Sequence, residues 1–474
     1  MGKQNRLPRN LRFYAAMVAS KAAVLALKVT HHAGGQMPGV VATKLCPDVL
    51  GRLEMPEHVI VVTGTNGKTT TSNLIADILT SAGEKPLINR MGGNVTEGVI
   101  STLLKGSTVG GKARAKYAVI ELDERCSKFV FPYLTPEVLV VTNLYRDTFT
   151  RNSHVGFVFD VLSRAIPSET TLLANADDLI SSRLAPQTKS RVYYSMQCAL
   201  PGDTKKPVSL VNDLNACPVC GGHLTYKTCH LGHIGQLTCD NCGCTNPASS
   251  FDAVSVDYDT NTLCVRENKP GDAAVREYHF SAGSVTDLYN LLAAISCART
   301  VGIPAEKIAH ALNNGVGIVE VRYDEAVAGG KRLVRIAAKG ENAMASSRGY
   351  ANVRRQSGSK AVILMSDNNH LAKNANEAEY VGWIYETDFE FLADDDIKQV
   401  VVTGTHCEDL VLRLMLAGVD PARIATAKDG IAAADCLDCE HVDSIYFSHA
   451  VDNYWDAKKA FEHLADLLNK KGVA

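Results

Sequence analysis

Residues 59–71, with the sequence Val59-Ile60-Val61-Val62-Thr63-Gly64-Thr65-Asn66-Gly67-Lys68-Thr69-Thr70-Thr71, set the architecture of the chain. The first half is a β-branched run typical of a buried parallel strand, and residues 72–79 have helical spacing. A strand, a glycine turn and a helix N-terminus direct N–H groups and a positive dipole at one point, as a triphosphate requires. We interpret the turn as a nucleotide-binding loop rather than as a chance Gly-Lys-Thr sequence.

The residues of the loop have distinct expected tasks. Lys68 would reach the β- and γ-phosphates, and the hydroxyl of Thr69 would bind Mg²⁺. The full Gly-x4-Gly-Lys-Thr pattern has a glycine at the position of Val62, so this loop is a variant. The residues expected to contact the nucleotide are Gly64, Thr65, Asn66, Gly67, Lys68, Thr69 and Thr70.

Length and composition restrict the class of protein. A chain of 474 residues is too long for one core, so two or three domains are expected. The formal net charge of −2 gives no electrostatic support for a nucleic-acid partner. We recognise no export signal and expect a cytoplasmic location, so the 14 cysteines are interpreted as thiols and metal ligands.

The N-terminal run 14–29 is apolar, but Lys21 and Lys28 interrupt it and it is short for a bilayer span. It predicts an amphipathic helix packed on the body of the protein, with a position near the inner face of the membrane as the alternative. The expected apolar face consists of Leu11, Ala15, Val18, Ala22 and Leu25.

Polar residues follow several predicted strands. Glu121 comes directly after the strand 117–120, at the mouth of an α/β sheet and beside the phosphate loop. It is the expected second Mg²⁺ ligand, with a solvated loop carboxylate as the alternative. The segments 143–147 and 175–178 also place polar residues directly after predicted strands. The alternation of strands and helices predicts an α/β fold with a doubly wound sheet.

Two Cys-x2-Cys pairs flank a short polar segment between residues 217 and 242. Four thiolates at this spacing can close a tetrahedral shell around Zn²⁺, which predicts an inserted zinc ribbon with a structural metal. The expected ligands are Cys217, Cys220, Cys239 and Cys242. Weaker candidates nearby are Cys229, His230, His233 and Cys244.

The last third of the chain predicts a smaller second α/β domain. Before it, a helix that starts after Ser284 carries Asn290, which would face the nucleotide or serve as a capping or core amide. We expect an N-terminal helix and lead-in at 1–50, a nucleotide-binding domain at 51–316 with the ribbon at 212–248, and a C-terminal domain at 317–474.

Together these motifs resemble one family. The loop 63–71 is similar to that of the Mur ligases and folylpolyglutamate synthetases. Within the Mur ligase superfamily, the chain resembles the MurT family, the Mur-ligase-like subunits of lipid II isoglutaminyl synthase. The closer resemblance depends on the inserted ribbon and on the segments 34–39, 121–124 and 143–147, and it runs from about residue 10 to the C-terminus.

The resemblance implies an ATP-dependent carbon–nitrogen ligase of peptidoglycan synthesis. Members of the family form a heterodimer with GatD, a glutamine amidotransferase that liberates ammonia, and the pair amidates the α-carboxylate of D-glutamate in lipid II. ATP would phosphorylate the carboxylate, with Lys68 and with Mg²⁺ on Thr69 and Glu121, before ammonia displaces phosphate. The positions that match family residues near ATP are Asn175, Asp177 and Asn290.

The C-terminal region departs from the family pattern. Where the family has an aspartate thought to complete the partner's Cys/His pair, this chain has Glu377 and Tyr380. Glu377 or Glu379 is therefore expected to orient the partner histidine. Thr148 stands where the amino-acid-adding Mur ligases have a histidine near a second metal, and the junction 316–320 lacks the family arginine.

Two other functions remain open from the sequence. One is a stand-alone amino-acid ligase similar to folylpolyglutamate synthetases, which would act without an amidotransferase. The other is a non-catalytic ATP-binding scaffold in cell-wall synthesis. The intact Lys68, Thr69 and Glu121 argue against the scaffold.

Overall fold

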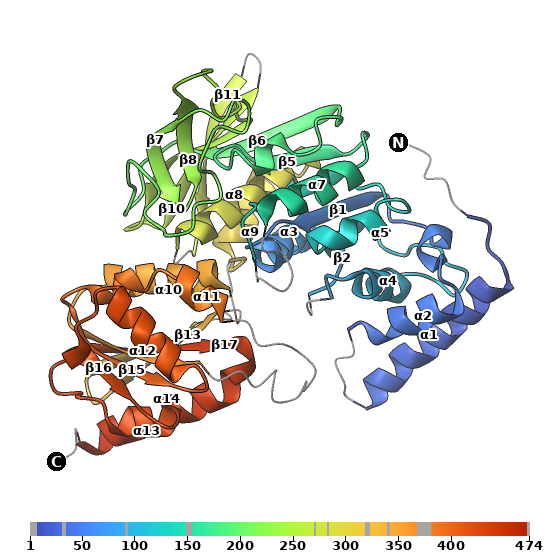
Figure 1. Cartoon of the computed structure of the whole chain (residues 1–474). Helices are drawn as coiled ribbons and strands as arrows, with labels where there is room; N and C mark the ends of the chain where they lie inside the picture. Colours follow the sequence, from blue (N-terminus) through green and yellow to red (C-terminus); the bar gives the residue numbers. More distant parts are fainter. Residues whose placement is uncertain are drawn as a thin grey trace. The chain divides into compact units, whose positions relative to one another are not determined.

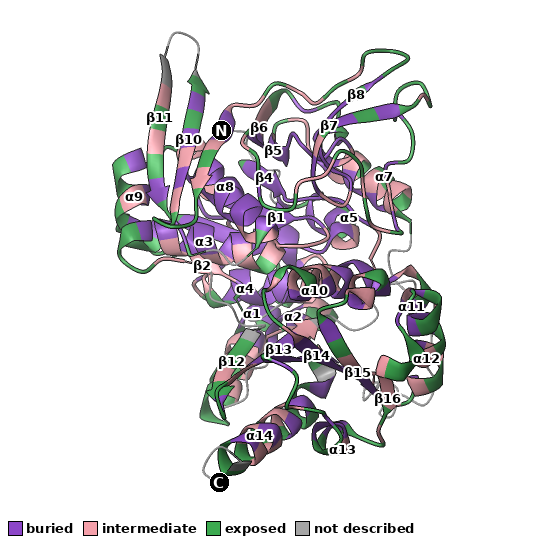
Figure 2. Ribbon diagram, turned by 90° about the vertical axis from the view of Figure 1, so that its left-hand side faces the viewer, coloured by how far each residue is buried: buried purple, intermediate pink, exposed green. Residues whose placement is uncertain are grey.

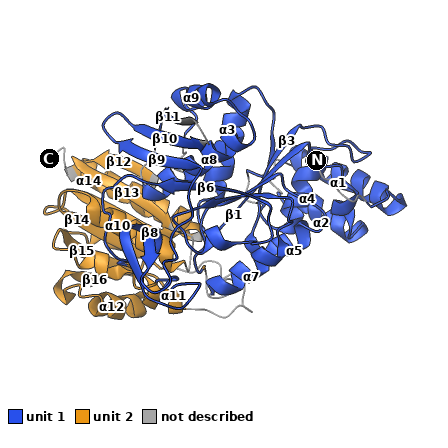
Figure 3. Cartoon of the chain, turned by 90° about the horizontal axis from the view of Figure 1, so that it is seen from above, with its two compact units in different colours: residues 1–146, 154–208, 212–318 blue, residues 147–153, 209–211, 319–474 orange. Residues whose placement is uncertain are grey.

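The computed structural model describes residues 7–30, 35–90, 93–147, 154–269, 272–281, 284–317, 323–338, 342–366 and 381–471. The chain divides into two compact units (Figure 3). The first contains residues 1–146, 154–208 and 212–318, and the second contains 147–153, 209–211 and 319–474. The division after residue 318 lies beside the boundary that the sequence suggested at 316, and residues 1–50 belong to the first unit.

A nine-stranded sheet with the order β11-β10-β9-β6-β5-β4-β1-β3-β2 forms the first unit (Figure 1). Its strands are β1 (His58–Thr63), β2 (Leu87–Ile88), β3 (Tyr117–Glu121), β4 (Val138–Val141), β5 (Thr171–Asn175), β6 (Ser190–Met196), β9 (Phe251–Asp257), β10 (Thr262–Lys269) and β11 (Asp272–His279). Following the sheet order from β9 to β2, each strand pairs in parallel with the next. Strand β10 pairs antiparallel with both β9 and β11. Because β3 and β4 flank β1 and lead to opposite edges, their carboxyl ends border the crevice where such sheets bind ligands.

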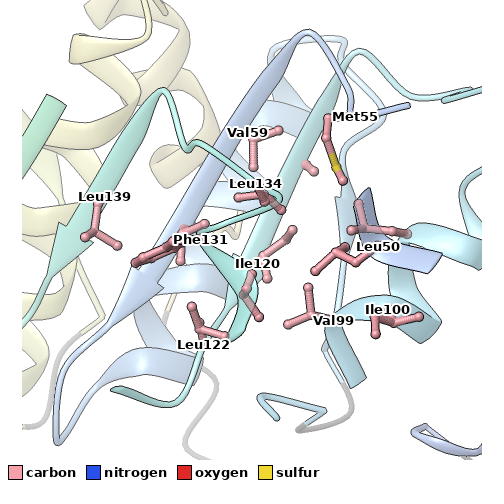
Figure 4. Packing of buried hydrophobic residues seen from close by; sticks show 14 of the residues in the cluster. Leu50, Met55, Val59, Val99, Ile100, Ile120, Leu122, Phe131, Leu134 and Leu139 are labelled. Atoms are coloured by element: carbon pink, nitrogen blue, oxygen red, sulfur yellow. The ribbon is translucent and has the colours of Figure 1, made fainter. Parts of the chain in front are cut away.

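Helices cover both faces of this sheet. They are α1 (Leu11–Val29), α2 (Met37–Leu45), α3 (Lys68–Ser81), α4 (Thr96–Lys105), α5 (Ser127–Val130), α7 (Val155–Ala165), α8 (Val285–Thr300) and α9 (Ala305–Asn313), with 3-10 turns η1 (Val49–Arg52), η2 (Glu124–Cys126) and η3 (Ser181–Arg183). On one face Val59 and Ile120 belong to one hydrophobic cluster with Val99 and Ile100 of α4 (Figure 4). None of the described residues of α3 or α8 belongs to that cluster, and these helices contact β1 and β3 to β6 from the other face. Most of α8 is buried (Figure 2).

The N-terminal helix α1 forms as expected, but the face we assigned to its core side is wrong. Phe13, Ala16, Met17 and Ser20 are fully buried, whereas the five residues expected to pack are all exposed, namely Leu11, Ala15, Val18, Ala22 and Leu25. Both sides of the helix are apolar, so periodicity alone could not distinguish them, and the bulkier Phe13 and Met17 take the core. Within the described ranges, no helix is long and apolar enough to cross a bilayer.

The second unit is built around a six-stranded sheet with the order β12-β13-β17-β14-β15-β16. Its strands are β12 (Tyr323–Ala328), β13 (Lys331–Ala338), β14 (Lys360–Met365), β15 (Ile397–Thr403), β16 (Ile424–Thr426) and β17 (Ser444–Ala450). Among these named strands, β12 and β13 form the antiparallel pair, and the other neighbours pair in parallel. Two hydrophobic clusters lie on its two faces. Helices α10 (Ala343–Arg355), α11 (Gly382–Glu386) and α12 (Cys407–Leu416) and the turn η5 (Phe389–Ala393) contribute side chains to one cluster. Helices α13 (Gly430–Asp435) and α14 (Tyr454–Lys471) contribute side chains to the other.

Candidate active site

The nucleotide loop connects β1 to α3 and depends on two glycines with a left-handed backbone. Gly64 has a φ of +123° and Gly67 a φ of +84°, which L side chains rarely adopt. A Cβ at Gly64 would lie 2.3 Å from Thr142 Oγ1, and one at Gly67 would lie 2.1 Å from Asn290 Oδ1. The loop is therefore held against the exit of β4 and against α8, with no room for a side chain at either glycine.

Val62 occupies the place of the glycine in the usual pattern because the strand continues through it. It is fully buried and pairs with Glu121 of β3 and Val140 of β4. A β-branched residue suits a central parallel strand, whereas glycine weakens one. The shorter glycine pattern thus reflects a β1 that extends to Thr63.

Lys68 is the first residue of α3, and its ammonium group stays within the loop. Nζ donates to the carbonyl of Gly64 at 2.6 Å and to Glu124 Oε1 at 2.9 Å. Burial lowers the pKa of Lys68, but the charge and hydrogen bond of Glu124 outweigh burial and leave the pKa above its ordinary value. Lys68 is therefore a cation at neutral pH, as neutralising phosphate charge requires.

Thr69 and Glu121 lie together beside the loop, as predicted for a shared ion. Thr69 Oγ1 donates to Glu121 Oε2 at 2.8 Å, and Asn94 Nδ2 donates to Glu121 Oε1 at 3.0 Å. Asn89 fixes the backbone of Glu121, accepting from its N–H at 2.8 Å and donating to its carbonyl at 2.9 Å. A hydroxyl and a carboxylate are the hard oxygen donors that Mg²⁺ prefers, so this pair fits that ion.

Two buried amides near the strand exits fit a ligand that supplies acceptors. The side chain of Asn143 binds the backbone of Asn66 through two hydrogen bonds. The N–H of Asn66 donates to Asn143 Oδ1, and Asn143 Nδ2 donates to the carbonyl of Asn66, each at 3.1 Å. The buried Nδ2 atoms of Asn66 and Asn175 have no hydrogen-bond partner in the part of the chain that the structure describes. An unpaired buried donor costs about 1–3 kcal/mol, and a nucleotide oxygen would satisfy it.

Asn290 lies beside the loop, as expected for a residue near the nucleotide. It is buried on α8, and its Oδ1 accepts from Thr71 Oγ1 at 3.4 Å. Thr70 is half-buried on the first turn of α3. The direct contacts of Asn290 and Thr70 with a nucleotide stay predictions.

Asp177 has a structural role that the sequence did not indicate. It is fully buried, and its carboxylate accepts from Ser195 Oγ at 2.7 Å, Met196 N–H at 2.6 Å and Tyr289 hydroxyl at 2.8 Å. Burial raises the pKa of Asp177. These bonds join β5, β6 and α8, and a contact of Asp177 with the nucleotide stays a prediction.

The four cysteines of the predicted ribbon meet at one end of the hairpin formed by β7 (Leu224–Leu231) and β8 (Ile234–Cys239). Their sulfur atoms all lie within 4.8 Å of one another, with 3.7 Å between Cys217 and Cys242 and 3.5 Å between Cys220 and Cys239. The N–H of Gly222 donates to Cys220 Sγ and lowers the pKa of that thiol. Four thiolates in so small a cluster fit a structural zinc ion.

Three of the weaker ligand candidates have protein partners instead. His230 Nδ1 lies 2.8 Å from Asp203, His233 Nε2 lies 3.1 Å from Asp178, and Cys229 Sγ donates to the carbonyl of Gly232 at 3.0 Å. Among the described residues, the four-cysteine group is the one cluster with metal-site geometry.

The hairpin also joins the ribbon to the nucleotide loop. The hydroxyl of Tyr145 donates to the carbonyl of Leu231 at 2.9 Å, and its backbone N–H donates to Thr65 Oγ1 at 2.9 Å. The rings of Tyr145 and His233 lie 4.4 Å apart between centroids. Burial raises the pKa of the Asp178 carboxyl, but the charge and hydrogen bond of His233 outweigh burial and lower the pKa below its ordinary value. Tyr145 therefore contacts both the ribbon hairpin and the nucleotide loop.

Comparisons with known proteins agree with this geometry. Residues 62–205 match the family model of the Mur ligase middle domain, and residues 345–449 match that of the MurT ligase C-terminal domain. The chain is 29% identical to the MurT subunit of the glutamine-hydrolysing lipid II isoglutaminyl synthase of Staphylococcus aureus (strain N315), over 96% of this chain and 98% of the relative. The chain is therefore similar to MurT subunits along nearly its whole length and carries two domains that match Mur ligase family models.

A second relative and two solved structures extend the comparison. The MurT subunit of Streptococcus pneumoniae is 25% identical, with 86% of this chain and 88% of the relative covered. A pseudomurein peptide ligase type C from Methanothermus fervidus has a TM-score of 0.63 at 18% identity, covering 88% of this chain and 80% of the other. The MurF ligase of Thermotoga maritima, solved in complex with ADP, has a TM-score of 0.56 at 13% identity, covering 92% and 85%. The last two show that the Mur ligase fold extends over most of the chain.

Polar residues after β4 have protein partners. Arg146 Nε donates to Asp213 Oδ1 at 2.7 Å, within the first unit. Asp147 belongs to the second unit, where Asn342 Nδ2 donates to its carboxylate at 2.7 Å. Thr148, where the amino-acid-adding Mur ligases have a histidine, lies outside the described residues.

The carboxylates expected at a partner interface, Glu377 and Glu379, also lie outside the described residues, so their role stays a prediction. Nearby in sequence, the second unit buries Asp388, which accepts from the N–H of Leu210 at 2.6 Å, and burial raises its pKa. Glu390 lies 2.8 Å from Arg413. Asp388 and Glu390 therefore have partners within the second unit.

Sequence reasoning missed two residues of the site, Glu124 and Asn94. Glu121 and Glu124 stand three positions apart, and the η2 turn begins at Glu124, so both carboxylates can face the loop. That spacing was the available signal for Glu124. Asn94 reaches Glu121 from the segment before α4, a contact between distant parts of the chain that periodicity does not report.

Proposed function

We propose that this chain is the ATP-dependent, Mur-ligase-type subunit of a lipid II isoglutaminyl synthase. It would amidate the α-carboxylate of D-glutamate in the lipid II stem peptide, with ammonia from a GatD-type glutaminase partner. The observation that carries the proposal is the likeness to a MurT subunit over 96% of this chain and 98% of the relative. The contact between Thr69 and Glu121 beside Lys68 supports a phosphoryl-transfer step.

The proposed reaction has two steps. A carboxylate oxygen of D-glutamate attacks the γ-phosphorus of ATP, and the bond from that phosphorus to the bridging oxygen breaks, giving an acyl phosphate and ADP. Ammonia then attacks the acyl carbon, phosphate leaves with the electron pair of the carbon–oxygen bond, and the nitrogen loses a proton. The product is the α-amide, D-isoglutamine.

The residues of the loop would stabilise the first step. Lys68, held by Gly64 and Glu124, would neutralise charge on the transferring phosphoryl group. The N–H groups at the N-terminus of α3 would bind phosphate oxygens. Thr69 and Glu121 would hold Mg²⁺, which stabilises negative charge on those oxygens when bound.

The rest of the chain would support assembly. Glu377 or Glu379 would orient a histidine of the glutaminase, and the ribbon would hold a structural Zn²⁺ ion on Cys217, Cys220, Cys239 and Cys242. We place the reaction on the cytoplasmic side of the membrane.

An assay that supplies ammonia directly tests the proposed function. Purified chain, ATP, Mg²⁺ and lipid II should yield amidated lipid II with ammonium chloride, and with glutamine only when a GatD-type partner is added. Mass spectrometry of the stem peptide measures the product. Lys68→Ala should abolish it, and the exposed-lysine control Lys85→Ala should not. Ligation of an amino acid, or no product with either nitrogen source, would contradict the proposal.

A further inference from the structure

The N-terminal helix α1 carries an apolar stripe on its outward face. Its large members, Leu11, Val18, Leu25 and Val29, are 88%, 58%, 63% and 72% exposed, and the intervening Ala15 and Ala22 are exposed as well. The members are spaced alternately four and three residues apart, which keeps them on one side of a helix. The stripe extends along a helix of 19 residues, about 28 Å at 1.5 Å per residue.

The opposite face of α1 is fixed to the protein, so the stripe has a defined orientation. Phe13 and Met17 are buried in the core of the first unit. Ser20 Oγ donates to the carbonyl of Pro38 at 3.0 Å, and Lys21 Nζ donates to the carbonyls of Leu104 and Ser107 at 2.5 Å and 2.6 Å. In Figure 1, α1 lies outside α2 and α4. A helix that is apolar all round is stable when both sides are covered, and the protein covers one.

The sequence around the stripe is basic and has no acidic residue. Residues 1–47 contain neither Asp nor Glu, although acidic residues number 51 of 474 in the whole chain. Their seven basic residues are Lys3, Arg6, Arg9, Arg12, Lys21, Lys28 and Lys44. Arg12, Lys28 and Lys44 are exposed, and Tyr14 is 44% exposed beside the stripe. Exposed cations and a tyrosine beside an aliphatic face are typical of a helix that lies in the headgroup region of an anionic bilayer.

The same observations disfavour a protein as the occupant. A second copy of the stripe would bring like charges such as Arg12 and Lys28 together, which repels. The centres of protein interfaces are enriched in aromatic residues, whereas this stripe is made of Leu, Val and Ala. An anionic lipid surface matches both the charge and the aliphatic character.

We propose that α1 is a membrane-docking helix that inserts its apolar stripe into the surface of an anionic bilayer. The biological use of this docking depends on the proposed function, because lipid II is displayed on a membrane. The docking itself needs lipid alone.

Vesicle flotation of the full-length chain tests this proposal. The vesicles contain equimolar phosphatidylglycerol and phosphatidylcholine and no peptidoglycan precursor. We expect the wild type to float and Val18→Glu/Leu25→Glu to bind at least about tenfold more weakly, because two apolar anchors become anionic. The matched control is Leu412→Glu/Leu416→Glu on α12, where the side chains are 50% and 67% exposed, and it should float like the wild type.

Two measurements strengthen this test. Arg12→Gln and Lys28→Gln should each weaken binding to the anionic vesicles about fivefold, with no effect on phosphatidylcholine vesicles. The thermal unfolding midpoint of the stripe variant should equal that of the wild type, since both substituted side chains are exposed.

Equal flotation of the wild type and the stripe variant, or no flotation of the wild type, would overturn the proposal. So would a stripe variant that floats normally but loses self-association or binding to an amidotransferase, since the stripe would then cover a protein. Failure of the proposed function would appear in the ammonia assay and leave flotation in these precursor-free vesicles unchanged.

Discussion

Glu124 binds the ammonium group of Lys68 and favours its charged form. It is almost fully buried and accepts from Lys68 Nζ at 2.9 Å and from the N–H of Gly64 at 3.1 Å. The pKa of Lys68 in the fold is raised above its ordinary 10.5. The stabilising contribution of this pair is therefore present below the unfolded pKa and is lost as pH rises through the folded one. Removing Glu124 would take away the largest of the contributions that raise the pKa of Lys68 and leave the opposing effect of burial in place.

Glu124→Gln should therefore move the alkaline limit of ATP turnover to lower pH. The amide keeps the size of the side chain but removes the charge that holds Lys68 protonated. A pH profile of kcat for the wild type, for Glu124→Gln and for the exposed control Glu57→Gln measures the shift. An alkaline limb that does not move in Glu124→Gln would show that Glu124 is not the controlling group.

Thr69→Val should weaken the dependence of turnover on Mg²⁺, because valine keeps the shape and removes the hydroxyl that meets Glu121. We expect the Mg²⁺ concentration for half-maximal turnover to rise at least about tenfold, and Thr69→Ser to restore it. If valine and threonine gave the same titration, Thr69 would not be a metal ligand.

At the scale of elements, the proposed zinc ion would stabilise the ribbon, because its four cysteines meet in one cluster. We expect purified protein to contain one zinc ion per chain, and Cys220→Ser to lose it and to lower the unfolding midpoint by more than about 5 °C. Cys436→Ser is the matched control, since Cys436 is also exposed and lies outside the cluster. Elemental analysis and calorimetry measure both effects. A zinc-free wild type of unchanged stability would refute the metal site.

Tyr145 links the ribbon hairpin to the loop through the carbonyl of Leu231. Tyr145→Phe removes the hydroxyl bond to Leu231 and keeps the backbone N–H that donates to Thr65. It should lower the free energy of unfolding by about 0.5–1.5 kcal/mol and raise KM for ATP, because the segment that holds Thr65 is then anchored less firmly. Denaturant unfolding and ATP kinetics check this, with Tyr385→Phe, which is 44% exposed, as the control. Equal KM values for Tyr145→Phe and the wild type would mean that the ribbon and the loop are not coupled.

Local signals predicted those elements that local physics determines. The β-branched run gave β1, Ser284 caps α8 through Asp287 N–H, and the cysteine spacing gave the four-sulfur cluster. The strands β11 and β12 were missed because they are polar edge strands without a clean alternation. The packed face of α1 was wrong because tertiary contacts, not periodicity, select between two apolar sides.

The site was predictable where its residues follow a motif. Lys68 and Thr69 come from the loop pattern, and Glu121, predicted from its place at the end of a strand, accepts from Thr69. The pairing of Lys68 with Glu124 and the engagement of Asp177 by Tyr289 join segments 56 and 112 residues apart. Such contacts depend on the folded sheet, and the spacing of Glu124 three residues after Glu121 was the one local signal for either of them.

For the whole molecule, the proposal requires a second protein that supplies ammonia. We expect Glu377→Ala or Glu379→Ala to reduce glutamine hydrolysis by the partner at least about tenfold while ATP binding by this chain stays unchanged, because a carboxylate that orients a histidine acts on the partner. Parallel glutaminase and nucleotide-binding assays separate the effects, with exposed Glu408→Ala as the control. If neither variant lowered hydrolysis, the interface carboxylate would lie elsewhere.

The fate of the substrate's carboxylate oxygen tests the proposed chemistry most directly. Lipid II whose D-glutamate α-carboxylate carries heavy oxygen is incubated with ATP, Mg²⁺, ammonia and the chain, and the released phosphate is analysed by mass spectrometry. Phosphoryl transfer at Lys68, Thr69 and Glu121 predicts one heavy oxygen atom in each phosphate formed per amide. Amide formation with unlabelled phosphate would contradict activation of the carboxylate by ATP.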